Sequence, residues 1–112
     1  MDTRVKIAAP GAAAALAPGT RVVSGSFDPL LRQHADELAE LRQGCSALAV
    51  VVTEPAEPLL PARARAELVA ALRCVDAVFL DSEGAPPADV RLEEGHERLR
   101  AGFLRHVRAR QS

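Results

Sequence analysis

SALAVVVT, residues 46–53, is the stretch that decides the fold class. Its continuous apolar run is typical of a parallel strand that is covered on both faces. Two further runs, 20–25 and 75–80, have the length and β-branched character of strands. The segments 30–43 and 61–73 between them carry apolar residues at helical spacing. This order predicts an α/β protein: a three-layer α/β/α sandwich with a parallel, Rossmann-like sheet and right-handed crossovers.

The rest of the chain is expected to complete a single domain spanning residues 1–112. The alanine run at 12–15 predicts a short helix between two Pro-Gly pairs. Residues 81–91 are acidic and rich in proline, which predicts a surface loop. Apolar residues near helical spacing then predict a final helix at about 92–110.

Composition excludes several classes of function. The formal net charge is -1, so there is no overall field to attract nucleic acid or an anionic membrane, and neither is expected as a partner. The longest apolar run is far shorter than the roughly 20 residues that a membrane span needs. The two cysteines, Cys45 and Cys74, lack metal-ligand spacing, so no protein-held metal site is expected. They favour a reduced, cytoplasmic setting.

The candidate site follows the first predicted strand. In an open parallel sheet, ligands bind at the carboxyl ends of the strands, where helix N-termini present unpaired N–H groups. Gly25 stands at that end and allows a phosphate to approach the backbone closely. His34, in the first turn of the next helix, is placed to donate a hydrogen bond to a phosphate oxygen.

Two motifs then indicate a family. VVSGSFDPLLRQHADELAEL, followed by LLPARARAELVAALRCVDAVF, resembles the nucleotidyltransferases of the cytidylyltransferase type, most closely glycerol-phosphate cytidylyltransferase and ADP-heptose synthase. These proteins carry G-x-F-D-x-x-H-x-G-H at the first turn and R-x-x-x-L-x-x-L-x-x-V-D-x-V across the second helix and third strand. The resemblance covers about residues 20–80. It implies binding of a nucleotide or phosphate by Gly25, Ser26, Phe27, Asp28, His34 and Arg65, with His34 as the candidate catalytic residue.

The first motif is broken at two positions. Leu31 replaces the first histidine and Gln33 replaces the glycine. In the family the two histidines stabilise charge on the nucleotide phosphates while pyrophosphate leaves. Leucine donates no hydrogen bond, and losing one such donor costs about 2.7–4 kcal/mol, roughly a hundred- to thousandfold in rate. The family's later lysine-bearing segment is also missing, since Lys6 is the only lysine.

Some of these residues have structural roles open to them. Phe27 packing into the core, Asp28 capping the next helix and Arg65 on a solvated helix face are the structural alternatives to ligand binding. His34 is either a phosphate donor or a helix residue without a ligand.

The sequence therefore predicts a degenerate nucleotidyltransferase-like domain, a pseudoenzyme that binds a nucleotide or phosphate weakly or acts as a protein-interaction module. The expected affinity is on the order of a millimolar dissociation constant, tighter below about pH 6.5 if His34 gains charge. The alternative is an active cytidylyl- or adenylyltransferase that uses CTP or ATP with Mg²⁺ and a phosphorylated sugar or alcohol. A three-strand sheet also needs cover at an edge, either from the final helix or from a second copy of the chain in a homodimer.

Overall fold

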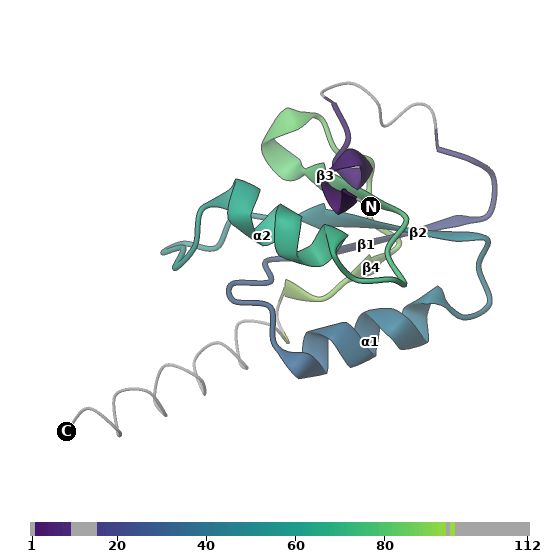
Figure 1. Ribbon diagram of the computed structural model, residues 1–112, viewed down its shortest axis with the longest axis horizontal. Coiled ribbons are helices and arrows are strands. Elements are labelled where there is room, and N and C mark those ends of the chain that lie inside the picture. Colours follow the sequence, from purple (N-terminus) through teal and green to yellow (C-terminus); the bar gives the residue numbers. More distant parts are fainter. Residues whose placement is uncertain (1, 10–15, 94, 96–112) are drawn as a thin grey trace.

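The protein is an α/β domain built on one parallel sheet (Figure 1). The computed structural model describes residues 2–9, 16–93 and 95. The strands predicted at 20–25, 46–53 and 75–80 and the helices predicted at 30–43 and 61–73 are confirmed. Their bounds are β1 Thr20–Gly25, α1 Arg32–Arg42, β2 Ala47–Val52, α2 Ala62–Ala70 and β3 Ala77–Leu80. β2 pairs in parallel with β1 and with β3, so each helix is a crossover between adjacent strands.

The main core lies between the sheet and the two helices. Val23 of β1, Val50 of β2 and Val78 of β3 form one fully buried cluster with Leu38 of α1 and Val69 of α2. Because side chains alternate along a strand, every second residue faces these helices. Both helices therefore cover the same face of the sheet.

The opposite face carries a smaller core without an α-helix among the described residues. Val22, Ala49, Val51 and Phe79 form this second cluster. The partly buried residues packed against it come from the N-terminal segment and from the chain after β3: Ala8, Leu16, Ala77, Ala85 and Ala88. The third layer of helices that the sequence predicted is thus not confirmed in the part of the chain that the structure describes.

The prediction of a surface loop at 81–91 is wrong in part. This segment contains a 3-10 turn, η3 Asp81–Glu83, and a fourth strand, β4 Val90–Arg91, which pairs in parallel with β1. The sheet order is therefore β3-β2-β1-β4. Asp89 leads into the strand: its amide donates to Val22 O (2.8 Å) and its carboxylate accepts from Val22 N (2.9 Å). Two residues are too short to show an alternating pattern, so the strand is visible only through its pairing.

Other segments of the chain pair with part of each edge of the three-strand unit. β4 lies beside β1, and on the other side Ile7 forms a parallel bridge with Val78 while Ala8 N donates to Val78 O (2.8 Å). The N-terminal 3-10 helix η1 Thr3–Lys6 precedes this bridge, and Lys6 Nζ donates to Leu72 O just after α2 (3.0 Å). The edges that motivated a homodimer are therefore partly paired within the chain, and the dimer stays a prediction.

Two predicted helices, at 12–15 and over most of 92–110, lie outside the described residues. Among the helices that are described, none has the length and apolar character needed to cross a membrane.

Candidate functional site

The predicted site residues gather around the turn between β1 and α1, at the carboxyl edge of the sheet. Gly25 ends β1, and its carbonyl accepts a hydrogen bond from Thr53 N just after β2 (2.9 Å). Ser26, Phe27 and Asp28 follow and are all buried. Phe27 has a positive φ of 48°, a backbone conformation that costs a non-glycine residue about 1–2 kcal/mol. The turn is therefore held in place by its surroundings rather than by its own preference.

Phe27 packs into the core, which is the structural alternative to ligand binding that the sequence offered for it. Its side chain is fully buried in the main cluster. Its ring meets the imidazole of His34 edge to face, with ring centroids 5.8 Å apart and planes at 88°. This contact fixes the position of His34 relative to the turn.

His34 takes part in the capping of α1. Its Nδ1 accepts a hydrogen bond from the backbone N–H of Leu31 (3.0 Å), while His34 N donates to Leu31 O (3.0 Å). Since Nδ1 is an acceptor, the proton of the neutral ring is on Nε2. A charged ring would carry a proton on Nδ1 as well, so imidazolium and this capping bond exclude one another. His34 is only 2% exposed, which encloses it between the helix and the turn.

Asp28 is not the N-cap of the next helix, because Leu31 holds that position, so the structural alternative of capping is not the role that the structure shows. Its carboxylate instead accepts from Leu59 N (2.6 Å) and Leu60 N (2.8 Å), in the loop immediately before α2. Pro61 is the N-cap of α2 and offers no side-chain hydrogen bond. Asp28 therefore ties the turn after β1 to the start of a different helix, about thirty residues along the chain.

Arg65 does not lie on a solvated helix face, so the structural alternative that the sequence offered for it is wrong. It is completely buried and donates to three backbone carbonyls: Ser26 O (2.9 Å), Thr53 O (2.7 Å) and Leu60 O (3.0 Å). Its remaining contact is an ion pair with Glu54, whose side chain is half exposed. Four of the five N–H groups of the guanidinium are therefore already in use.

Together Arg65 and Asp28 lock two loops to each other. Arg65 reaches from α2 to the turn after β1, and Asp28 reaches from that turn to the loop before α2. Three of the side chains that the motif assigns to ligand binding, those of Asp28, His34 and Arg65, are thus already hydrogen-bonded within the protein. Gln33, in place of the motif glycine, is exposed at the start of α1.

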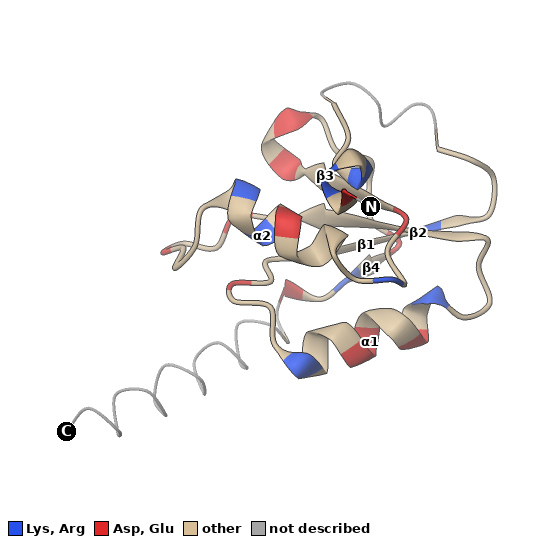
Figure 2. Ribbon diagram, in the orientation of Figure 1, with Lys and Arg blue, Asp and Glu red and all other residues tan. Residues whose placement is uncertain are grey.

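The charged side chains around this site are balanced. Figure 2 shows basic residues at both ends of α1 with acidic residues between them. Among the described residues, no three His, Cys, Asp or Glu side chains are grouped closely enough to hold a metal ion.

Asp76 is a structural residue whose partners the sequence did not reveal. Its Oδ2 accepts from Leu48 N at the start of β2 (2.8 Å) and from Arg42 Nε at the end of α1 (3.1 Å). Asp76 N donates in turn to Leu48 O (2.9 Å). The Val-Asp pair of the second motif was the available signal. The structure shows that its aspartate aligns β2 with the chain entering β3.

The sequence matches no protein-family model and no curated protein. The resemblance to nucleotidyltransferases therefore depends on the two motifs alone.

Proposed function

We propose that this protein is a catalytically silent, nucleotidyltransferase-like module that binds a phosphate-bearing ligand only weakly. The observation that carries the proposal is the use of the motif side chains within the protein. Asp28 holds two backbone amides, His34 caps α1, and Arg65 holds three carbonyls. These side chains must break their hydrogen bonds within the protein before they can bind a nucleotide.

The cost of reassigning these side chains adds to the loss of a catalytic donor. Leu31 is the N-cap of α1 and makes no side-chain capping bond. Its hydrocarbon side chain cannot replace the imidazole that the family uses, a loss of about 2.7–4 kcal/mol in transition-state stabilisation. Releasing Arg65 would also leave buried carbonyls without donors, at about 1–3 kcal/mol each. Both effects disfavour turnover.

What remains for a phosphate is the backbone at the start of α1. The helix has eleven residues, and the first-turn amides together with the helix dipole favour an anion there. The proposed affinity is in the millimolar range. Tighter binding at low pH is the effect predicted from a charged His34, and it would have to offset the loss of the Leu31 hydrogen bond.

The test is a pyrophosphate-release assay with CTP or ATP, Mg²⁺ and a panel of phosphorylated sugars and alcohols. We expect rates at the level of the reaction without protein. His34→Gln is the matched variant, because glutamine at this helix position can still accept from the N-cap amide while the imidazole is lost. Turnover in the native chain that disappears in His34→Gln would establish the active nucleotidyltransferase and overturn the proposal.

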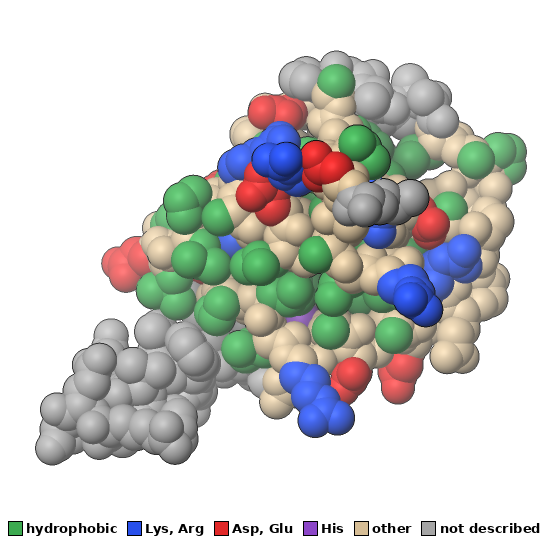
Figure 3. Space-filling view, viewed as in Figure 1, with side chains coloured by type: hydrophobic (Ala, Val, Ile, Leu, Met, Phe, Trp, Pro, Cys, Tyr) green, Lys and Arg blue, Asp and Glu red, His purple; other side chains and the backbone are tan. Residues whose placement is uncertain are grey.

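Nucleotide titration followed by amide NMR tests the binding part separately. Shifts that cluster between Gly25 and His34 at millimolar ligand support a residual phosphate site. No shift at such concentrations would refute ligand binding and favour the protein-interaction module. The surface to examine in that case is α2 and the loop before it, where Leu59 and Leu68 are each 45% exposed. Figure 3 shows hydrophobic side chains gathered over this helix.

A further inference from the structure

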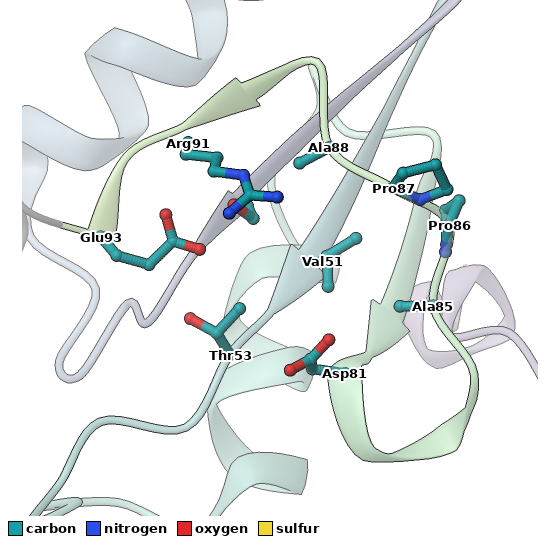
Figure 4. A pocket seen from close by; sticks show the side chains of 10 residues that line it. Val51, Thr53, Asp81, Ala85, Pro86, Pro87, Ala88, Arg91 and Glu93 are labelled. Carbon is teal, nitrogen blue, oxygen red and sulfur yellow. The ribbon is translucent and has the colours of Figure 1, made fainter.

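A pocket lies at the carboxyl edge of the sheet, on the face opposite α1 and α2 (Figure 4). Its volume is about 250 Å³. That is below the roughly 300–1,000 Å³ of pockets for drug-sized ligands, and it suits a molecule of a few non-hydrogen atoms. The lining residues are Ser24, Val51, Thr53, Asp81, Ala85, Pro86, Pro87, Ala88, Arg91 and Glu93. None of them belongs to the site predicted from the motifs.

The strand register explains why polar residues meet here. Ser24 of β1 is paired with Val51 of β2 on one side and with Arg91 of β4 on the other. Thr53 and Glu93 each lie two residues beyond these partners, just after β2 and β4 end, and both line the pocket. The pocket thus forms where β4 joins the sheet next to β1. This is the point at which the chain reverses its direction of travel across the sheet, the usual ligand position in open α/β sheets.

Ser24 carries a buried hydroxyl group that the packing of the fold does not account for. It is 4% exposed, and its Oγ has no hydrogen-bond partner among the described residues. A buried polar group without a partner costs about 1–3 kcal/mol, and an apolar residue of similar size would avoid that cost. Ser24 also borders the pocket directly. An acceptor at the base of the pocket would satisfy its hydroxyl.

The charged groups at the pocket likewise have no partner among the described residues. In the part of the chain that the structure describes, Arg91, Glu93 and Asp81 form no ion pair and no side-chain hydrogen bond. Figure 4 shows the guanidinium of Arg91 directed into the pocket from β4, with the carboxylate of Glu93 turned toward it and Asp81 on the opposite side. The pocket therefore offers one cationic group beside Ser24 and two carboxylates at its rim.

The balance of these charges selects the ligand. One guanidinium and two carboxylates give the lining a net charge of about -1 at neutral pH. A dianionic phosphate beside both carboxylates would be repelled by more charge than Arg91 alone compensates. A carboxylate near Arg91 and Ser24 requires only one anionic group, and an ammonium on the same molecule would meet Glu93 or Asp81.

We propose that this pocket binds a small zwitterion of the amino-acid class. Arg91 and Ser24 Oγ donate to its carboxylate, and Glu93 and Asp81 accept from its ammonium group. Bidentate pairing with a carboxylate is the geometry for which a guanidinium is suited. The site is separate from the phosphate site proposed above, because His34 lies with α1 on the other face of the sheet.

The test is a titration of the full chain followed by amide NMR, with glycine and serine as zwitterions. Acetate supplies the anion alone, ethylamine the cation alone, and inorganic phosphate the competing chemistry. We expect both zwitterions to shift the amides of Ser24, Thr53 and Arg91 at millimolar concentration. Acetate and ethylamine should each bind at least tenfold more weakly.

Variants separate recognition from folding. Arg91→Gln and Glu93→Gln should each weaken zwitterion binding at least tenfold, and Ser24→Ala should weaken it severalfold. Arg32→Gln makes the same charge change on an arginine whose side chain is 92% exposed at the start of α1, and it should bind like the native chain. Circular dichroism melting curves check that each variant is folded.

Three results would overturn the proposal. The first is the absence of any shift with 50 mM zwitterion, roughly the limit for a weak specific site of millimolar affinity. The second is equal binding of zwitterion by the native chain and by Arg91→Gln. The third is saturable binding of inorganic phosphate at these same amides in preference to glycine, which would show that the pocket recognises a different chemistry. None of these results bears on pyrophosphate release or on shifts between Gly25 and His34, so the two proposals fail separately.

Discussion

Replacing Arg65 by methionine should destabilise the protein strongly, although methionine has a similar length and favours helices. The change removes the donors to Ser26 O, Thr53 O and Leu60 O and the ion pair with Glu54. An unsatisfied buried acceptor costs about 1–3 kcal/mol. Two of these three bonds are only part-buried, so water can replace part of the loss. We therefore expect a loss of about 3–5 kcal/mol, from one fully buried acceptor and two acceptors that water partly satisfies.

That loss is large compared with the stability of a domain of this size. At about 0.05–0.15 kcal/mol per residue, a chain of 112 residues has a free energy of unfolding of about 6–17 kcal/mol. Urea denaturation followed by far-UV circular dichroism measures the change, because the chain has no Trp or Tyr for fluorescence. With a slope of about 2 kcal/mol per molar urea, the midpoint should fall by about 2 M.

Two further variants make the result specific. Arg65→Lys keeps the charge but replaces the fork of donors by one ammonium group, so most of the loss should remain. Arg63→Met makes the same substitution two residues earlier, where the side chain is 58% exposed, and it should change stability by less than about 0.5 kcal/mol. If the free energy of unfolding of Arg65→Met lies within about 1 kcal/mol of the native value, this arginine does not lock the two loops to each other.

Three other substitutions test single features of the fold. Asp28→Asn should lower stability by about 1–3 kcal/mol in urea, because an amide NH₂ would face one of the N–H groups of Leu59 and Leu60; no loss would mean that these bonds contribute little. Gly19→Ala should cost at least about 1–2 kcal/mol in thermal melts, since Gly19 has φ +85° and an added Cβ would lie 2.6 Å from Ser46 Oγ; an unchanged melting temperature would contradict this. Burial raises the pKa of the Cys74 thiol, so the folded state keeps its proton at a pH where the unfolded chain loses it. The free energy of unfolding should therefore decline as pH rises through about 9 and above, and this decline should be smaller in Cys74→Ala. A difference in free energy of unfolding between the two proteins that does not change with pH would contradict this prediction.

The sequence alone determined the elements that have a period of their own. β2 is apolar over its whole length, and α1 and α2 repeat apolar residues at helical spacing, so local pattern and propensity sufficed for their type and for their bounds within a few residues. The parallel arrangement followed from the alternation of strands and helices. Gly25, Phe27, Asp28 and His34 could likewise be placed at one turn, because they are close in the chain.

Only the tertiary structure decided what these residues contact. Arg65 meets Ser26 O from 39 positions away, and Asp28 meets the amides of Leu59 and Leu60 from 31 and 32 positions away. No local pattern encodes such partners, since an arginine on a nine-residue helix has the same spacing whether it faces water or carbonyls. β4 was missed for the same reason: its two residues become a strand only through pairing with β1. The pocket that joins Ser24 to Arg91 depends on that pairing. Side-chain alternation along each strand determines which residues face the same side of the sheet. Which polar side chains then lie next to one another depends on the register between strands that are far apart in the sequence.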